Sequence, residues 1–215
     1  MTRIHAAELI GTLILVMCGI GTGIMGTDLA QGNLAIALFA NAFATGLVLY
    51  LLITILGPIS GAHMNPAVTL YFLLSREIGP ARAGGYVAAQ LAGALLAVAL
   101  THLMFGQPVV QTAATGRAAP GLWLGEAIAT FGLCLTIAGA RLHAPRQLPA
   151  LVGAWIAAAF WFTSSASFAN PAVTVARMFS DTFTGILPAH APAYIAAQLA
   201  AAIVAALTLP KLFSR

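Results

Sequence analysis

Two closely similar stretches are the most informative part of the sequence, SGAHMNPAVT at Ser60–Thr69 and SFANPAVTVAR at Ser167–Arg177. Both contain the pentamer NPAVT, which begins at Asn65 in the first copy and at Asn170 in the second. Asn is a favoured N-cap residue, and Pro is well suited to the first position of a helix. The sequence therefore predicts that a helix begins at each pentamer.

The flanks of the two pentamers also repeat. A stretch with one glutamate precedes each copy, AAELIGTLILV around Glu8 and LGEAIATFGLCL around Glu126. A matching pair follows, GGYVAAQLAGALLA around Gln90 and PAYIAAQLAAAIVAA around Gln198. Because these landmarks occur in the same order in both halves, they indicate an internal repeat.

The composition identifies the surrounding medium as lipid. Of the 215 residues, 60% are apolar and 7% are charged, and the mean hydropathy is +0.96. A soluble domain carries roughly a quarter charged residues, so a soluble enzyme, a disordered region and a nucleic-acid-binding protein are excluded. A spanning helix needs about 20 mostly apolar residues. Six stretches predict such helices in an all-α membrane protein: 4–25, 33–56, 84–105, 121–141, 148–163 and 192–210.

Two further apolar segments, 65–75 and 170–180, are too short to cross a membrane. Segments of this length predict re-entrant half-helices, which are tolerated only where protein or a water-filled cavity surrounds them. Three spans in each repeat, about 1–105 and about 121–215, require the second repeat to enter from the opposite side. We therefore expect a single transmembrane domain over residues 1–215, with an inverted repeat and a permeation site near the midplane.

The positive charges predict how the chain is oriented. With six spans both termini share a side, and the basic residues on that side are Arg3, Arg76, Arg82, Arg141, Arg146, Lys211 and Arg215. The opposite side holds Arg117 and Arg177. The positive-inside rule then places both termini in the cytoplasm, for a multi-pass protein of the plasma (inner) membrane.

The paired half-helices predict a pore that excludes ions. Each helix N-terminus carries roughly half a positive charge, so two N-termini that face each other repel cations and protons. The side-chain amides there can donate hydrogen bonds to a neutral solute. The candidate central constriction consists of Asn65, Pro66, Ala67, Asn170, Pro171 and Ala172.

The two Asn-Pro-Ala boxes and the glutamate helices resemble the aquaporin (major intrinsic protein) family over essentially the whole chain. The resemblance implies six transmembrane helices plus two half-helices and a homotetramer with one pore per protomer. It also implies passive passage of water and small neutral solutes. Because the sequence has no His/Cys/Asp/Glu cluster with metal-ligand spacing and no nucleophile–base pair, we expect no metal, cofactor or enzymatic activity.

The resemblance also assigns a selectivity filter. In most aquaporins an arginine follows the second Asn-Pro-Ala, but Val173 stands there in this chain. Ungapped matching to the family puts the other filter positions at Thr45, Ala158 and Ser167. None of the four residues is aromatic or charged, so we expect a wide and weakly polar filter.

The solute is predicted less sharply. The run Phe160–Phe183 is similar to a bacterial aquaglyceroporin branch associated with arsenic resistance, which implies arsenite or methylated arsenicals beside glycerol-like polyols. Thr174 stands where glycerol facilitators typically carry Asp. Two alternatives are a strict water channel and an ion-coupled secondary transporter, because inverted repeats and broken helices occur in transporters too.

Four more residues are candidates for special roles. Arg177 lies one turn beyond Val173 on the same helix face, where it either replaces the missing filter arginine at the outer mouth or extends to the lipid headgroups. His63 either lines the cytoplasmic vestibule or packs within its loop. Glu8 and Glu126 are intramembrane acids, which suggests a proton relay, but their symmetric placement favours structural acceptors for the backbone of the re-entrant loops.

Overall fold

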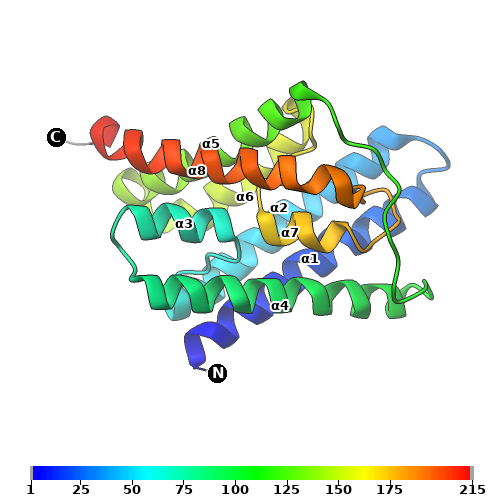
Figure 1. Ribbon diagram of the computed structural model, residues 1–215, viewed down its shortest axis with the longest axis horizontal. Coiled ribbons are helices and arrows are strands. Elements are labelled where there is room, and N and C mark those ends of the chain that lie inside the picture. The colour runs from blue at the N-terminus through cyan, green and yellow to red at the C-terminus, as the bar shows by residue number, and fades with distance from the viewer. Residues whose placement is uncertain (1, 214–215) are drawn as a thin grey trace.

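Long helices surround two short helices that meet end to end (Figure 1). The computed structural model describes residues 2–213, and no strand occurs within them. In chain order the α-helices are α1 (Arg3–Leu29), α2 (Leu34–Ser60), α3 (Pro66–Leu74), α4 (Pro80–Met104), α5 (Pro120–His143), α6 (Leu148–Phe162), α7 (Pro171–Arg177) and α8 (Ala191–Phe213). The 3₁₀ turns are η1 (Pro145–Gln147) and η2 (Pro188–His190).

The spanning helices follow the predicted apolar stretches. Within the described chain, five helical segments are long and apolar enough to cross a membrane alone, namely α1, α2, α4, α5 and α8 with η2. Helix α6 has 15 residues, or about 22 Å at 1.5 Å per residue, and η1 directly precedes it. The predicted ends of all six spans agree with the structure to within four residues. The predicted all-α membrane fold is thus confirmed.

The half-helices approach each other from opposite ends of the bundle. In Figure 1, α3 and α7 lie between α4 and α8, and their N-terminal ends face each other near the middle. We call the end where α1 begins and α8 ends the terminal face, and the end that carries residues 105–119 and 178–190 the loop face. Arg215, which contributed to the predicted orientation, lies outside the described residues.

Helix α7 is shorter than the predicted segment 170–180. It ends at Arg177, after which the N–H groups of Met178 and Phe179 donate to the carbonyls of Val175 and Ala176. These hydrogen bonds join residues three positions apart, as in a 3₁₀-helix, so they tighten the last turn and end the α-helix. The other half-helix, α3, matches its prediction to within one residue at each end.

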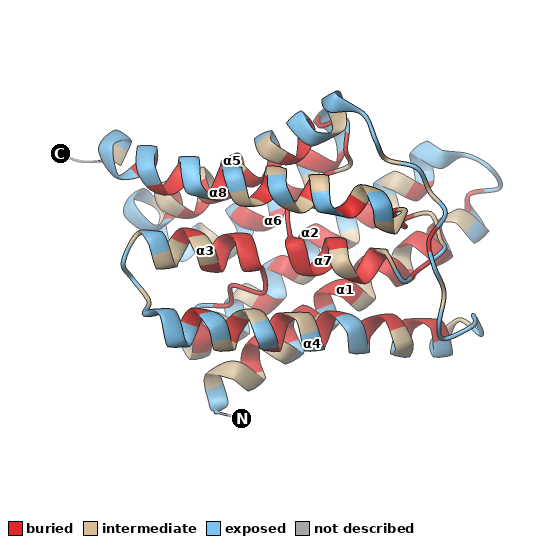
Figure 2. Cartoon of the chain, in the orientation of Figure 1, coloured by how far each residue is buried: buried red, intermediate tan, exposed pale blue. Residues whose placement is uncertain are grey.

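Glycines allow the long helices to pack closely. A Cβ atom at Gly93 of α4 would overlap the carbonyl oxygen of Leu9 in α1. Gly153 of α6 faces Gly46 of α2, and a Cβ at Gly153 would lie 2.5 Å from the Gly46 oxygen. Small residues at such contacts are typical of helix association in lipid. Figure 2 shows that the buried sides of the helices line the interior, including the facing ends of α3 and α7.

Candidate functional site

Two asparagines begin the half-helices. The Oδ1 atom of Asn65 accepts a hydrogen bond from the Ala67 N–H at 2.8 Å, and Oδ1 of Asn170 accepts from the Ala172 N–H at 2.9 Å. These are N-cap interactions, with Pro at the following position in both helices. Asn170 also accepts a longer hydrogen bond from the Val173 N–H at 3.4 Å. The side chains thereby satisfy backbone donors that a helix start leaves without a partner.

The same asparagines connect the two half-helices. The Nδ2 group of Asn65 donates to the carbonyl of Ala169 at 2.7 Å, and Nδ2 of Asn170 donates to the carbonyl of Met64 at 2.8 Å. Each of these carbonyls belongs to the residue just before the other asparagine. Since a side-chain amide carries two hydrogens, each asparagine retains a second donor beside its cross-link.

The loops before the half-helices have strained backbones at equivalent positions. Ala62 and Met64 both have φ of 49°, and Ser167 and Ala169 both have φ of 46°. These residues stand three and one positions before their asparagine in both halves. A left-handed conformation is unfavourable for residues with a Cβ atom, by about 1–2 kcal/mol each. Such strain persists only where the surrounding structure determines the conformation.

Glu8 holds the first strained loop. It is fully buried in α1, and its carboxylate accepts hydrogen bonds from the backbone N–H groups of His63 at 2.9 Å and Met64 at 2.6 Å. It also accepts from the Ser60 hydroxyl at 2.6 Å and from the Gln90 amide at 2.8 Å.

Glu126 of α5 does the same for the second loop. It accepts from the N–H groups of Phe168 and Ala169, both at 2.8 Å, and from the amide of Gln198 at 2.5 Å. Neither Glu126 nor Glu8 lines the central cavity described below. This geometry favours structural acceptors over a proton relay.

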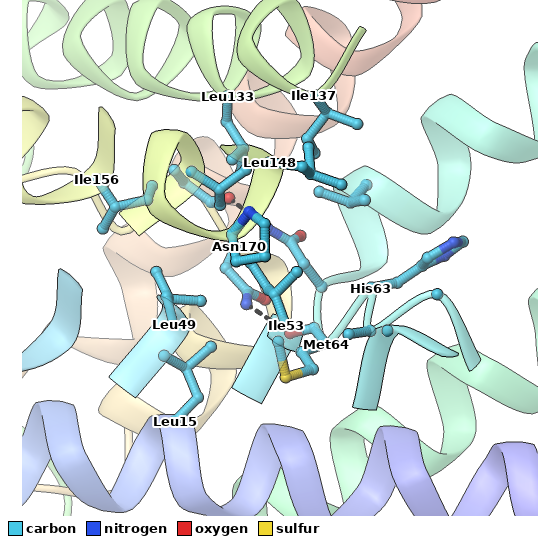
Figure 3. A pocket seen from close by; sticks show the side chains of 18 of the residues that line it. Leu15, Leu49, Ile53, His63, Met64, Leu133, Ile137, Leu148, Ile156 and Asn170 are labelled. Atoms are coloured by element: carbon cyan, nitrogen blue, oxygen red, sulfur yellow. Dashed lines mark hydrogen bonds between the residues drawn. The ribbon is translucent and has the colours of Figure 1, made fainter. Parts of the chain in front are cut away.

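A cavity of about 550 Å³ extends past the facing half-helices. It begins at the terminal face beside Glu77 and Arg141, passes Asn65 and Asn170, and reaches Arg177 toward the loop face. Figure 3 shows apolar side chains surrounding the lumen near Asn170. Apolar residues that line it include Leu15, Leu49, Ile53, Leu133, Ile137, Leu148 and Ile156.

His63 combines the two roles predicted for it. It lines the cavity between the terminal face and Asn65. Its ring also stacks on Phe72 with the ring centres 4.5 Å apart, and its Nδ1 lies 3.2 Å from the Thr69 hydroxyl. These contacts fix the orientation of the imidazole, and its labelled side chain is visible in Figure 3.

Three of the four predicted filter residues line the cavity. Thr45, Ser167 and Val173 do so, but Ala158 is exposed on the outside of α6. The lumen-facing positions of α6 are instead Leu148, Pro149, Val152, Ile156 and Phe160, and all of these but Pro149 recur every four residues. Position 158 lies two residues from 156 and from 160, on the opposite side of a helix with 3.6 residues per turn.

The filter region is therefore more aromatic than the sequence predicted. Phe160 lines the cavity, and so does Phe168, which precedes Asn170 by two residues. The internal repeat is the signal that would have identified Phe168, because it occupies the position that His63 holds relative to Asn65.

Arg177 lies inside the protein and not at the lipid headgroups. Only 5% of its surface is exposed, and its guanidinium carbon lies 4.1 Å from the centre of the Phe168 ring, in cation–π contact. It lines the central cavity one turn beyond Val173. Its side chain makes no hydrogen bond or ion pair with another residue in the described part of the chain. The alternative that Arg177 extends to the lipid headgroups is therefore wrong.

Comparison with known proteins assigns the family. The family model described as "Major intrinsic protein" matches residues 1–163, which is more than half of the chain. The chain belongs to the major intrinsic protein family. The predicted family resemblance is thus confirmed, and this major intrinsic protein is a multi-pass membrane protein of a channel family.

Relatives of this major intrinsic protein differ in how much they share with it. It is 50% identical to Aquaglyceroporin AqpS of Rhizobium meliloti (strain 1021) over 189 residues, covering 87% of this chain and 80% of the relative. It is 36% identical to the lens fiber major intrinsic protein of Lithobates pipiens over 121 residues, covering 56% of this chain and 44% of that protein. The X-ray structure of the aquaglyceroporin from Plasmodium falciparum matches with a TM-score of 0.73 over 98% of this chain and 94% of that chain, at 21% identity. That likeness shows the shared fold.

Proposed function

We propose that the protein is a passive channel for water and small uncharged solutes in the plasma (inner) membrane, with both termini in the cytoplasm. The observation that carries the proposal is the central cavity, which passes the facing N-termini of α3 and α7 at Asn65 and Asn170. The remaining amide hydrogens of these asparagines can donate to a passing solute. The facing positive helix ends disfavour cations and protons at the same point.

In this proposal Arg177 takes the place of the missing filter arginine. Its guanidinium lies beside the cavity and lacks an acceptor within the described residues, so its N–H groups are free to donate to a solute oxygen. Thr45, Ser167 and Val173 leave the rest of the filter small. Phe160 supplies an apolar wall against which the carbon atoms of a polyol can pack.

The proposed solutes are glycerol-like polyols, together with neutral arsenite or methylated arsenicals. The small residues Thr45 and Val173 support the wider range over strict water selectivity. The 50% identity to a protein named an aquaglyceroporin supports the polyols.

Coupling to an ion is disfavoured by the placement of the acids. Glu8 and Glu126 are occupied by the loops and lie away from the lumen. Glu77 lines the cavity at the terminal face, but it forms a bidentate ion pair with Arg141, with N–O distances of 2.9 and 2.6 Å. This leaves no unpaired carboxylate among the described cavity-lining residues to exchange protons during transport.

We also propose that the protein assembles as a homotetramer with one pore per protomer. The outward surface of α2 carries large exposed apolar side chains along its whole length, including Phe39, Phe43, Leu47, Tyr50 and Ile55. Such a surface fits either lipid or a neighbouring protomer.

Stopped-flow light scattering of proteoliposomes tests the function. Water, glycerol, urea and arsenite are compared on one preparation, with protein-free liposomes as the control. The channel predicts fast, saturation-free fluxes that are the same with and without a sodium or proton gradient. Fluxes that require an ion gradient would show a coupled transporter, and rapid flux of water alone would show a strict water channel.

A further inference from the structure

A second cavity, of about 370 Å³, opens beside the loop-face end of the central cavity. We call this loop-face cavity the vestibule; it is distinct from the cytoplasmic vestibule predicted beside His63. It shares Phe160, Phe168 and Arg177 with the central cavity, so these three side chains lie between the two cavities at the filter. Its wall combines two arginines with four aromatic residues: Arg117, Arg177, Phe160, Trp161, Phe168 and Phe183.

The two guanidinium groups of the vestibule gather at one aromatic ring. The guanidinium carbon of Arg177 lies 4.1 Å from the centre of the Phe168 ring, and that of Arg117 lies 5.2 Å from the same point. Arg117 is anchored by two hydrogen bonds, from its Nε to the Gly185 carbonyl at 2.9 Å and from its Nη2 to the Phe183 carbonyl at 3.4 Å. A guanidinium has five N–H donors, so Arg117 is held in position with donors to spare.

No carboxylate in the described residues balances these charges within the vestibule. The two acids of the loop face are Asp28 and Asp181, and neither lines this cavity. Asp181 instead accepts a hydrogen bond from the Ala114 N–H at 2.9 Å. Arg177 is almost completely buried. Glu126 attracts Arg177 electrostatically but forms no ion pair with it. Burial of this guanidinium without a hydrogen-bonded anion is unfavourable, and an anion in the vestibule would offset this directly.

We propose that the vestibule binds a small organic monoanion that carries a planar carboxylate and an apolar body. The carboxylate is held by Arg177 and Arg117, because guanidinium geometry matches carboxylate oxygens. The apolar body packs against Phe160, Trp161 and Phe183. A molecule bound there lies against Phe160, Phe168 and Arg177, which also line the central cavity, so its binding also slows solute entry. The proposed anion site is argued from the geometry of the vestibule and does not depend on which solutes the channel passes.

Isothermal titration calorimetry of the purified protein tests the site with sodium benzoate as the probe. Benzamide, which has the same shape without the charge, is the control ligand. Benzoate is expected to bind at least ten-fold more tightly than benzamide, and more weakly as salt is added. Equal affinity of benzoate and benzamide would overturn the proposal.

Matched variants locate the binding. Arg117→Gln and Arg177→Gln are each expected to weaken benzoate binding at least ten-fold, while Arg3→Gln, an exposed cation on the terminal face, leaves it unchanged. If Arg177→Gln does not yield folded protein, Arg117→Gln decides, and unchanged binding by that variant would refute the site. Water permeability without benzoate is measured in parallel, so that failure of the channel and failure of the anion site are distinguishable.

Discussion

The side-chain amide of Asn65 donates a hydrogen bond to the backbone carbonyl of Ala169 at 2.7 Å, although the two residues are 104 positions apart. Asn170 returns an equivalent bond to Met64 at 2.8 Å. Each asparagine therefore caps its own half-helix and also links it to the loop before the other half-helix. This reciprocal link sets the distance between the two helix ends, and it makes the central constriction a single unit.

Replacement of either asparagine tests this link. Asn65→Ala and Asn170→Ala each remove an N-cap worth about 1 kcal/mol and a cross-link of about the same size. We expect each variant to lower the free energy of unfolding by about 2 kcal/mol, as measured by thermal or chemical unfolding in detergent. The matched control is Asn33→Ala, because Asn33 caps α2 through the N–H groups of Ala35 and Ile36 and is exposed. A loss as large in Asn33→Ala would contradict the cross-link.

The two buried glutamates are predicted to carry more stability than any surface acid. In Glu8→Gln and Glu126→Gln the new NH₂ group cannot accept the backbone hydrogen bonds that the carboxylate accepts, so a buried loop donor is left unpaired. We expect a loss of at least about 2 kcal/mol of unfolding free energy. Glu77→Gln, in a half-exposed ion pair with Arg141, is expected to cost at most about 1 kcal/mol. Equal effects of the three substitutions would rule out the structural role.

Helix α6 is predicted to contribute Phe160 to the filter. Phe160→Ala removes an aromatic wall, so we expect flux of solutes larger than glycerol to rise relative to water flux in stopped-flow measurements. Ala158→Leu adds volume on the exposed side of the same helix and is expected to leave both fluxes unchanged. Reduced flux in Ala158→Leu would show instead that position 158 faces the lumen.

Arg177 is predicted to set solute selectivity at the loop-face end of the pore. Arg177→Ala removes the buried cation, so we expect weaker discrimination among neutral solutes and weaker exclusion of cations, measured as relative glycerol and urea fluxes and as ion leak. Unchanged selectivity together with unchanged ion exclusion would show that the residue has no filter role.

Val173→Arg tests the same region by adding a cation instead of removing one. A guanidinium at position 173, added beside Arg177, is expected to narrow the filter and to reduce glycerol flux more than water flux. Equal fractional losses for water and glycerol would contradict a filter at this position.

The parts of the fold that depend on local chemistry could be predicted from the sequence. Asn65-Pro66 and Asn170-Pro171 specify helix starts, because capping involves neighbouring residues only. The apolar stretches give the spanning helices because lipid requires them to be long. The end of α7 at Arg177 could not be predicted, since it depends on how residues 178–190 fold back.

Residues of the candidate site could be predicted only where their spacing along a helix determines the side on which the side chain lies. Arg177 follows Val173 by one helical turn, so its place on the lumen side was a valid expectation. Ungapped matching to the family places Ala158 in the filter, but the helical rotation of α6 puts this residue on the exposed side. The role of Arg117 follows from tertiary contacts with residues 183 and 185, and no local pattern indicates these contacts.

We expect neutral molecules to pass between the facing ends of α3 and α7 and ions and protons to be excluded there. Water flux and proton flux are measured simultaneously in one proteoliposome preparation, with Val173→Trp as a variant that fills the lumen. The protein is predicted to conduct water well above the protein-free rate with no added proton flux, and Val173→Trp to remove the water flux. Proton flux that rises together with water flux, or water flux that persists in Val173→Trp, would contradict the claim.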